Sequence, residues 1–502
     1  MIATNRATPC RLYVYITFCI GFILPNVNLL ADEASLQDAA GQWQGERPNI
    51  LWIMIEDWST DLSCYGTALV HTPNIDGLAQ QGIRFERAYT TSPVCSTSRS
   101  AMMTGFHQNY IGAHQHRTKD KKPLPYGIKP IPHLLEEIGY YTATMVGGKT
   151  DCNFTTSRKL FMGKNWRERK AGQPFYVQAT FGGTHRSFAR DPEHPIDADK
   201  VKLPPYYPDL PLVRRDWANG LETVQVVDRQ VGKLLQQLED DGLADNTIVF
   251  FIGDHGRCHI RGKQFLYEGG VRIPLIVRWP KHIKPGSVSK ELLSSLDICQ
   301  TIVKLAGAKP AHDLHGLYLF GEEVPARGYV HFNRDKMDDT HDAIRAIRSD
   351  RFKLIHNLMP ERAYCQLNEY KERQYPILAL MNVLNMTGQL NPVQARFMAA
   401  GKPEFELYDL QNDPYEINNL ADDPDYAETQ AKLLAEIDRW RTEVKDVGVT
   451  DAFRKGGWSA NYPTKSLKEW QSDLREWEQA LLVDGQASRG GPKKRNRNRK
   501  QK

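Results

Sequence analysis

The sequence predicts an α/β protein: an α/β/α sandwich with a large, mostly parallel mixed sheet, plus a smaller C-terminal α+β domain with an antiparallel sheet. Three observations lead to this prediction: nearly continuous apolar runs, helical segments between them, and a change of pattern after about residue 338. Apolar runs without alternation are typical of parallel strands that are covered on both faces. Strands that alternate with helices indicate a parallel sheet between two helical layers.

The predicted strands of the first part are five apolar runs. They are NILWIMI (49–55), YYTATMV (140–146), PFYVQATF (174–181), NTIVFFI (246–252) and IPLIVRW (273–279). Helices are predicted between them. Residues 72–82 have Pro73 at a helix start and Gly82 at its end, and residues 131–140 and 222–238 are further helices.

The second part combines short strands with helices. Residues 343–357 read as two strands around the turn Ser349-Asp350, and residues 405–420 as a strand followed by a proline-containing turn. Residues 361–403 are mostly helical and loop-like, and 427–445 form an amphipathic helix. A last helix begins at Ser466, where Glu469 completes a capping box. Its apolar stripe, which we expect to pack onto the body, is Leu467, Trp470, Leu474, Trp477 and Leu481.

The two ends of the chain differ from the body. Residues 12–31 carry no charge, follow Arg6 and Arg11, and contain an apolar stretch that is short for a bilayer span. We therefore expect a signal peptide over 1–31, no stable membrane span, and a secreted or periplasmic protein; the alternative is an uncleaved anchor. The predicted domains are a large domain over 46–337 and a C-terminal subdomain over 338–484.

Residues 485–502 are predicted to be a disordered basic tail, with eight Lys and Arg and no acid. Taking these and the two Arg of the leader from the total of +5 leaves about −5 for residues 32–484. The composition, 41% apolar and 25% charged, is that of an ordinary globular protein. We find no nucleic-acid-binding motif. The eight cysteines contain no CxxC pair, which excludes a disulfide-built scaffold.

Ionisable residues follow four of the predicted strands. They are Glu56-Asp57 after 49–55, Lys149 after 140–146, His185 after 174–181, and Asp254-His255 after 246–252. Sites of open α/β sheets form at the carboxyl ends of strands, so we expect these groups to meet at one edge. Each alone has an ordinary structural explanation, such as a solvated turn or a structural histidine; their convergence favours a site.

The convergent groups predict a metal centre with an anionic ligand. Three carboxylates and an imidazole suit a hard divalent cation such as Ca²⁺ or Mg²⁺, and the imidazole leaves a transition metal such as Mn²⁺ open. Arg99, Lys149, His185 and Lys263 add positive charge. A metal ion and several cations around one point indicate a phosphate or sulfate group in the substrate.

The stretch SPVCSTSRSAMMTG (92–105) resembles the signature of the type I sulfatases, Cys-X-Pro-X-Arg followed by a run that ends in Thr-Gly. Cys95, Arg99 and Thr104-Gly105 match. Glu56-Asp57 and Asp254-His255 resemble the metal pairs of the family, Lys149 its Gly-Lys motif, and Lys263 the lysine before Tyr-Glu-Gly-Gly-Val-Arg. ELYDLQNDPYEINNL (406–420) resembles its C-terminal signature. The resemblance covers residues 47–445 and implies the alkaline-phosphatase-like fold.

The resemblance also implies the chemistry. It implies that a maturation enzyme oxidises Cys95 to formylglycine (3-oxoalanine), whose hydrate binds the metal. The metal lowers the pKa of one hydroxyl of this hydrate, and that oxygen attacks sulfur. Asp254 takes the proton, and Arg99 holds the hydrate and the carboxylates. Lys149, Lys263 and His185 hold the sulfuryl oxygens, and Lys263 or His185 protonates the leaving group. The second hydroxyl then expels sulfate.

Within the family, three stretches are similar to the N-sulfoglucosamine sulfohydrolases. They are GFHQNYIGAHQHR (105–117), THR (184–186) and IRAIRSDRFKLIHNL (344–358). This similarity implies a sulfated saccharide as substrate, with O-sulfate or N-sulfate left open. It adds His107, His114 and His116 to Lys149, His185 and Lys263 as expected substrate-binding residues.

Three residues depart from the family pattern. Thr97 stands at the usual proline, which bears on recognition by the maturation enzyme; Glu56 replaces an aspartate; and Asp151 stands where many members have a histidine. The cation that such a histidine offers to the leaving group is then either absent or supplied by another residue, such as His185 or His116. Two other functions stay open: a phosphodiesterase or phosphonate hydrolase of the same superfamily, and a non-catalytic binder of sulfated polysaccharides. The sequence leaves the oligomeric state open.

Overall fold

The computed structural model describes residues 47–320, 326–338, 340–456 and 464–485. At its centre is a seven-stranded sheet with the order β4-β6-β1-β7-β8-β2-β9. β8 runs antiparallel to its neighbours β7 and β2, and the other neighbouring pairs are parallel, which confirms the mostly parallel mixed sheet. The strands are β1 (Asn49–Ile55), β2 (Ile83–Tyr89), β4 (Tyr141–Val146), β6 (Phe175–Phe181), β7 (Thr247–Gly253), β8 (Arg272–Arg278) and β9 (Ser287–Ser294).

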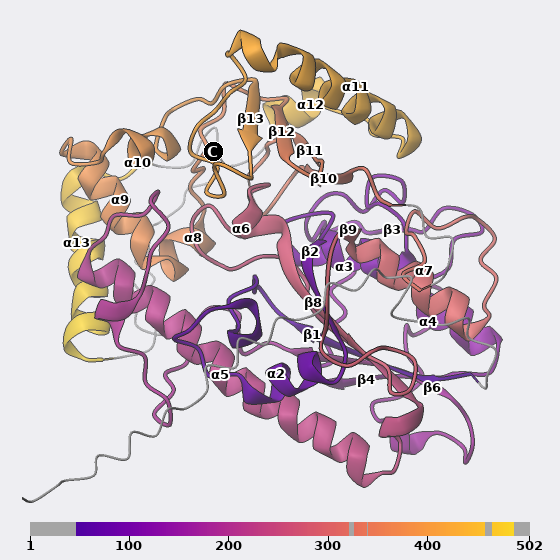
Figure 1. The fold of residues 1–502 in the computed structure, drawn as a ribbon. Coiled ribbons are helices and arrows are strands. Elements are labelled where there is room, and N and C mark those ends of the chain that lie inside the picture. The colour runs from indigo at the N-terminus through magenta and orange to yellow at the C-terminus, as the bar shows by residue number, and fades with distance from the viewer. Residues whose placement is uncertain (1–46, 321–325, 339, 457–463, 486–502) are drawn as a thin grey trace, which may run out of the picture. The chain divides into compact units, whose positions relative to one another are not determined.

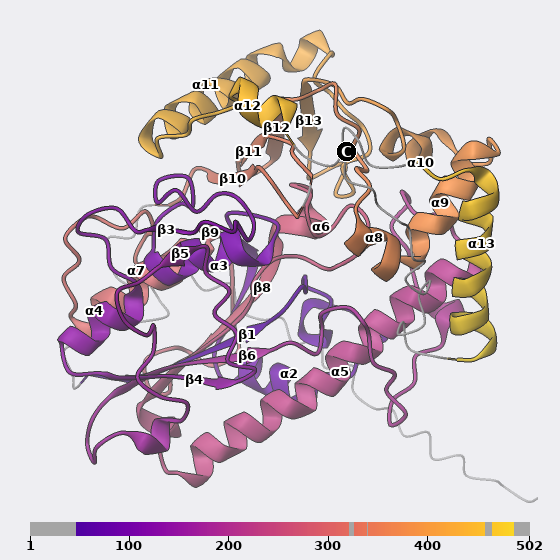
Figure 2. The ribbon, with the colours of Figure 1, turned by 180° about the vertical axis from the view of Figure 1, so that it is seen from behind.

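Helices cover both faces of this sheet (Figures 1 and 2). Alternate residues of β1 belong to two different hydrophobic clusters, so this strand is buried on both sides, as its unbroken apolar sequence predicts. On one face lie α2 (Pro73–Gln80) and α5 (Pro211–Asp240). On the other lie α3 (Cys95–Thr104), α4 (Ile131–Glu137) and α7 (Ser295–Ala306).

A second, four-stranded sheet is antiparallel throughout, in the order β10-β11-β12-β13. Its strands are β10 (Val330–Arg334), β11 (Ile344–Arg348), β12 (Phe352–Asn357) and β13 (Phe405–Asp409). The strands predicted within 343–357 and at the start of 405–420 are therefore present. Because β10 precedes residue 338 and pairs in this sheet, the small sheet begins before the predicted domain boundary, which stays a prediction.

Further helices connect and cover the two sheets. They are α6 (Glu268–Val271), α8 (Glu369–Gln374), α9 (Pro376–Met386), α10 (Pro392–Phe397), α11 (Ala427–Glu443), α12 (Asp451–Lys455) and α13 (Leu467–Glu478); the short strands β3 (Lys122–Pro123) and β5 (Phe154–Thr155) form a separate pair. Ser466 caps α13 with the predicted capping box. Trp470 and Trp477 are buried in the core, so the apolar stripe of α13 packs onto the body.

Some expectations concern residues beyond those described. The predicted signal peptide and the basic tail after Gly485 lie outside the described residues. Within the described part of the chain, no helix has the length and apolar character needed to cross a membrane. The six cysteines in that part are all unpaired, in agreement with the prediction that disulfides do not build this fold.

Candidate active site

The four strand ends predicted to converge lie side by side. In the parallel register, Ile55 at the end of β1 pairs with Phe181 of β6 and with Gly253 of β7, and Val146 of β4 pairs with Thr180 of β6. The polar residues that follow these strands therefore emerge at the same edge of the sheet. The topology alone brings together residues separated by up to two hundred positions in the chain.

Cys95 is the first residue of α3 and stands at the helix end where backbone N–H groups are free to bind an anion. Every residue of α3 is buried, so the small serines and threonine allow the helix to enter the centre of the molecule. Arg99 lies one turn later, on the same side of the helix as Cys95. At the position of the family proline, the hydroxyl of Thr97 donates to the Val94 carbonyl at 3.1 Å and contacts Ser92 Oγ at 2.7 Å.

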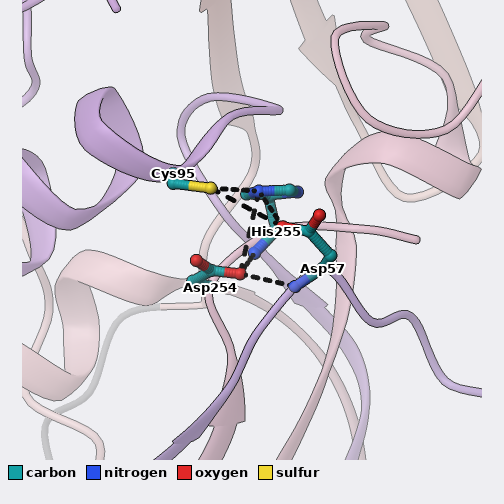
Figure 3. A group of neighbouring side chains, drawn as sticks. All are labelled: Asp57, Cys95, Asp254 and His255. Atoms are coloured by element: carbon teal, nitrogen blue, oxygen red, sulfur yellow. Dashed lines mark hydrogen bonds and ion pairs between the residues drawn. The ribbon is translucent and has the colours of Figure 1, made fainter. Parts of the chain in front are cut away.

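Four side chains point toward one another around a single centre (Figure 3). The ligand atoms of Asp57, Cys95, Asp254 and His255 all lie within 4.8 Å of one another, and all four residues are buried. His255 Nε2 is 3.2 Å from Cys95 Sγ and 2.9 Å from Asp57 Oδ1. Two carboxylates, an imidazole and the side chain at position 95 form a donor set that fits a divalent cation.

Neighbouring groups orient each of these donors. His255 Nδ1 donates to the Gly256 carbonyl at 2.9 Å, and this contact orients the ring so that Nε2 faces the centre. Lys263 Nζ donates to Asp57 Oδ2 at 2.7 Å, and Arg99 Nε donates to Asp254 Oδ2 at 3.0 Å. Each carboxylate thus has one oxygen held by a cation. Asp57 itself adopts a left-handed φ of 52°, a conformation that a non-glycine residue keeps only where its surroundings impose it.

Electrostatics at this centre favour bound positive charge. Burial raises the pKa of Asp57, but Lys263, His185 and His255 outweigh it and hold that pKa well below its usual value. Burial likewise raises the pKa of Asp254, whereas His255 and Arg99 lower it to about 2. Burial lowers the pKa of His255, yet Asp254 and Asp57 raise it to about 10. Both carboxylates are therefore ionised, and together they attract a cation, which is what a metal centre requires.

Glu56 lies beside this group but outside it. Its carboxylate accepts a hydrogen bond from Lys149 Nζ at 2.7 Å and lies 3.5 Å from Arg99 Nη2. The structure thus brings Glu56 to the site, where it fixes two cations, while its expected role as a metal ligand remains a prediction.

The expected cations surround the same centre. Lys263 Nζ lies 3.6 Å from Cys95 Sγ and 3.3 Å from His185 Nε2. His185 has 27% of its side chain exposed and therefore faces the open side of the site, whereas Lys263 is buried. Burial lowers the pKa of His185 against the attraction of Asp57, and Asp57 outweighs burial to keep the pKa of Lys263 well above its usual value.

The three histidines of 105–117 divide between two places. His116 Nδ1 is 2.9 Å from the hydroxyl of Ser96, the residue next to Cys95, and His114 Nδ1 is 2.7 Å from Asp335 Oδ2. His107 instead lines a separate cavity of about 340 Å³, with Trp440. The structure therefore brings His116 to the edge of the site and leaves His107 away from it.

Two features of the site were missed in the sequence. Tyr370 of α8 lies with its ring 5.3 Å from Lys263 Nζ, and no pattern in the sequence links this part of the chain to the strand ends. Asp151 is held by Arg117, whose guanidinium donates to it at 2.6 and 3.1 Å, and lies 3.7 Å from Lys149 Nζ. The only signal for the pairing of Arg117 with Asp151 was that Arg117 directly follows His116, a predicted substrate-binding residue.

Comparison with known proteins identifies the family. A family model described as Sulfatase matches residues 48–161 and 160–308, and a model described as N-sulphoglucosamine sulphohydrolase, C-terminal, matches residues 253–382. The chain belongs to the sulfatase family. An ulvan-active sulfatase of Formosa agariphila is 33% identical over 454 residues, which cover 80% of this chain and 76% of that sulfatase.

Other relatives agree with this membership. The human N-sulphoglucosamine sulphohydrolase is 26% identical over 468 residues, covering 79% of this chain and 90% of the human enzyme. A solved structure of a protein in complex with its substrate D-glucosamine-2-N,6-O-disulfate matches with a TM-score of 0.60 at 21% identity, and covers 82% of this chain and 100% of that one. The last comparison confirms the fold, and the family places the chain among the sulfuric ester hydrolases.

Proposed function

We propose that this sulfatase removes O-sulfate or N-sulfate groups from sulfated saccharides of the heparan type, by means of a formylglycine made from Cys95 and a divalent metal ion. The observation that supports this function is the buried group of Asp57, Cys95, Asp254 and His255, with the cations Arg99 and Lys263 in contact with it. Such a centre suits a small, strongly charged anion.

The saccharide substrate rests on the relatives. The relatives are named as an ulvan-active sulfatase and an N-sulphoglucosamine sulphohydrolase, and the solved structure is a complex with D-glucosamine-2-N,6-O-disulfate. We further propose that the chain is exported by the signal peptide over 1–31, so that it meets such polysaccharides outside the cytoplasm.

Ca²⁺ is the metal that we propose, because carboxylate oxygens are the ligands it prefers. Asp57, Asp254 and His255 would hold it together with residue 95, and Mg²⁺ or Mn²⁺ would suit the same donors. When present, the hydrated aldehyde and the metal supply an activated oxygen nucleophile that a thiol or a serine hydroxyl cannot replace.

The side chains of this protein bind and orient the sulfuryl group. Lys149 and Lys263 would offer ammonium groups to the sulfuryl oxygens and compensate the charge that develops on them. Asp254 receives the proton of the nucleophile. His185, which lies on the open side and 3.3 Å from Lys263 Nζ, would give a proton to the leaving oxygen or nitrogen.

Intact-peptide mass spectrometry and a substrate panel test the proposal. Protein expressed with a maturation enzyme should show the aldehyde at residue 95 and release sulfate from oligosaccharides of heparan, chondroitin, ulvan, fucan or carrageenan in the presence of Ca²⁺. The Cys95→Ala variant is the matched control and should release none. Phosphate esters, assayed side by side with Ca²⁺ and with Mn²⁺, distinguish the phosphodiesterase alternative. An unmodified thiol together with no turnover would instead indicate a non-catalytic binder.

A further inference from the structure

A groove leads away from the active site on the side of His116. Two hollows of about 670 and 510 Å³ share Gly112, His114, Gln115 and Lys122, and so form one continuous depression. We call it the 112–122 groove; its other walls are residues 335–338 with His341, and residues 445–453. Each hollow falls in the range of roughly 300–1,000 Å³ in which proteins bind small ligands.

Residues that line the groove are in contact with residues of the active site. The hydroxyl of Ser96 contacts His116 Nδ1 at 2.9 Å and accepts a hydrogen bond from the Arg117 backbone N–H at 3.1 Å. Arg117 then pairs with Asp151, which lies 3.7 Å from Lys149 Nζ. A substrate whose sulfate reaches residue 95 therefore has the groove beside it.

The groove offers positive charge that the described protein does not use. Lys119, Lys122 and Lys336 line it, and none of their ammonium groups has an ion pair or hydrogen bond among the described residues. Two of its acids are already partnered: Asp335 is bound by Arg345 at 2.9 Å and contacts His114, and Asp338 accepts a hydrogen bond from Gln264 Nε2 at 3.0 Å. Asp120 remains as an exposed acid, so unpaired cations outnumber it and favour an anionic ligand.

The far wall of the groove is held in place. Asp446 accepts hydrogen bonds from both arms of Arg345 at 2.8 and 2.7 Å, from Arg441 at 2.9 Å, and from Asn109 Nδ2 at 3.0 Å. This network ties the turn after α11 to the segment that precedes His114. The backbone around Lys445, which lines the groove, is therefore held in place, so a ligand need not order this turn.

An aromatic pair stands at the same end. The rings of His341 and Phe453 stack with centroids 4.7 Å apart and an interplanar angle of 18°. Both residues line the groove. A flat ring surface beside ammonium groups matches the apolar face and charged substituents of a sulfated sugar ring.

We propose that the 112–122 groove binds the neighbouring sugar units of a polyanionic oligosaccharide chain, with Lys122, Lys336 and Lys445 contacting sulfate or carboxylate groups that the enzyme does not hydrolyse. The enzyme thus selects chains over single sulfated sugars. The identity of this oligosaccharide rests on the proposed function. The groove would bind the part of the substrate that the reaction centre does not contact.

Binding is measured in the inactive Cys95→Ala protein, so that the outcome is independent of maturation and turnover. Isothermal titration calorimetry uses hexasaccharides and disaccharides of heparin and of ulvan, with single-stranded DNA as a polyanion without the sugar chain. We expect at least one hexasaccharide to bind about tenfold or more tightly than its disaccharide. The added substitutions Lys122→Ala and Lys336→Ala should each weaken hexasaccharide binding about threefold to fivefold and reduce its salt dependence, while disaccharide binding stays unchanged.

Lys281→Ala, an exposed lysine paired with Asp245, is the matched control and should change neither affinity. Thermal unfolding checks that each variant is folded, and Lys122→Arg should restore binding. Equal affinities for hexasaccharide and disaccharide, no binding of any hexasaccharide, or equally tight binding of DNA would overturn the proposal. Failure of turnover in the matured enzyme, with hexasaccharide binding intact, would contradict the proposed reaction and leave the groove assignment standing.

Discussion

Lys263 contacts three groups in and beside the reaction centre. Its Nζ touches Asp57 Oδ2, Cys95 Sγ and His185 Nε2 at 2.7, 3.6 and 3.3 Å. We predict that Lys263→Met lowers kcat by about 10²–10³, because one charged contact to the sulfuryl oxygens is lost in the transition state. Steady-state kinetics of the matured protein measure this, with Lys281→Met as control. A folded Lys263→Met protein with unchanged kcat would remove Lys263 from this role.

Thr97 gives a second prediction at the scale of a residue. It lies in the first turn of α3, where a proline costs the helix little because the first N–H groups have no partner within the helix. Thr97→Pro should therefore raise the fraction of Cys95 converted to the aldehyde and change the free energy of unfolding by only about 1 kcal/mol, the value of the lost hydroxyl bonds. Quantitative mass spectrometry of the peptide around residue 95 decides this. Equal conversion in both proteins would show that Thr97 is no obstacle.

The sequence predicted most of the site at this scale, for a physical reason. Residues that follow parallel strands share an edge, so Asp57, Lys149, His185 and Asp254 could be placed together without coordinates. Tyr370 could not, because its approach to Lys263 depends on how α8 packs against the large sheet. The contacts of Glu56 with Lys149 and Arg99 could not be predicted either, because they depend on side-chain geometry around one methylene group.

At the scale of elements, the strands of the large sheet with continuous apolar runs were predicted, and β2 and β9 were not. β2 and β9 carry charged residues within the strand, and their short, mixed sequences lack the continuous apolar run that marks β1 or β7. The antiparallel direction of β8 could not be predicted either, because an apolar run does not reveal in which direction the strand pairs with its neighbours. α5 begins at Pro211, earlier than the predicted 222, since its first turns bury residues such as Trp217 against the core.

Glu268 of α6 joins the two sheets and gives a prediction for elements. It accepts hydrogen bonds from Tyr89 of β2 and Lys353 of β12, both at 3.0 Å. Burial raises its pKa, but Lys353 and Arg348 lower it to about 2. We expect Glu268→Gln to be less stable by about 2 kcal/mol at neutral pH, because Lys353 loses one of its two buried carboxylate partners and keeps Glu416.

The pH dependence of that difference has a definite sign. A carboxylate whose pKa is depressed on folding stabilises the protein above its unfolded pKa and loses this effect as the pH falls through the folded value. The difference in free energy of unfolding between wild type and Glu268→Gln should therefore shrink as the pH falls from about 4.5 toward about 2. Urea unfolding at a series of pH values measures it. A difference that stays constant with pH would mean that the ion pair is not its source.

At the scale of the whole molecule, the metal centre should contribute to global stability. Asp57, Asp254 and His255 come from two strands and meet only in the folded chain, so a cation binds the native state and not the unfolded one. Ca²⁺ at about 100 times its Kd should add about 2.7 kcal/mol to the free energy of unfolding. Differential scanning calorimetry in Ca²⁺ and in chelator tests this, with Asp254→Asn as the control that responds least. An identical Tm in chelator, Ca²⁺, Mg²⁺ and Mn²⁺ would contradict a metal site here.

The complete burial of α3 also sets an order of events. Cys95 has no exposed surface, and every residue from Cys95 to Thr104 is enclosed by the finished fold. An enzyme that must grip this segment has access to it only while the chain is still open. On the proposed function, oxidation of Cys95 would therefore compete with folding, and a molecule that folds first would keep its thiol. The specific activity of a preparation would then depend on the fraction of molecules converted before they fold, as well as on the chemistry of the active site.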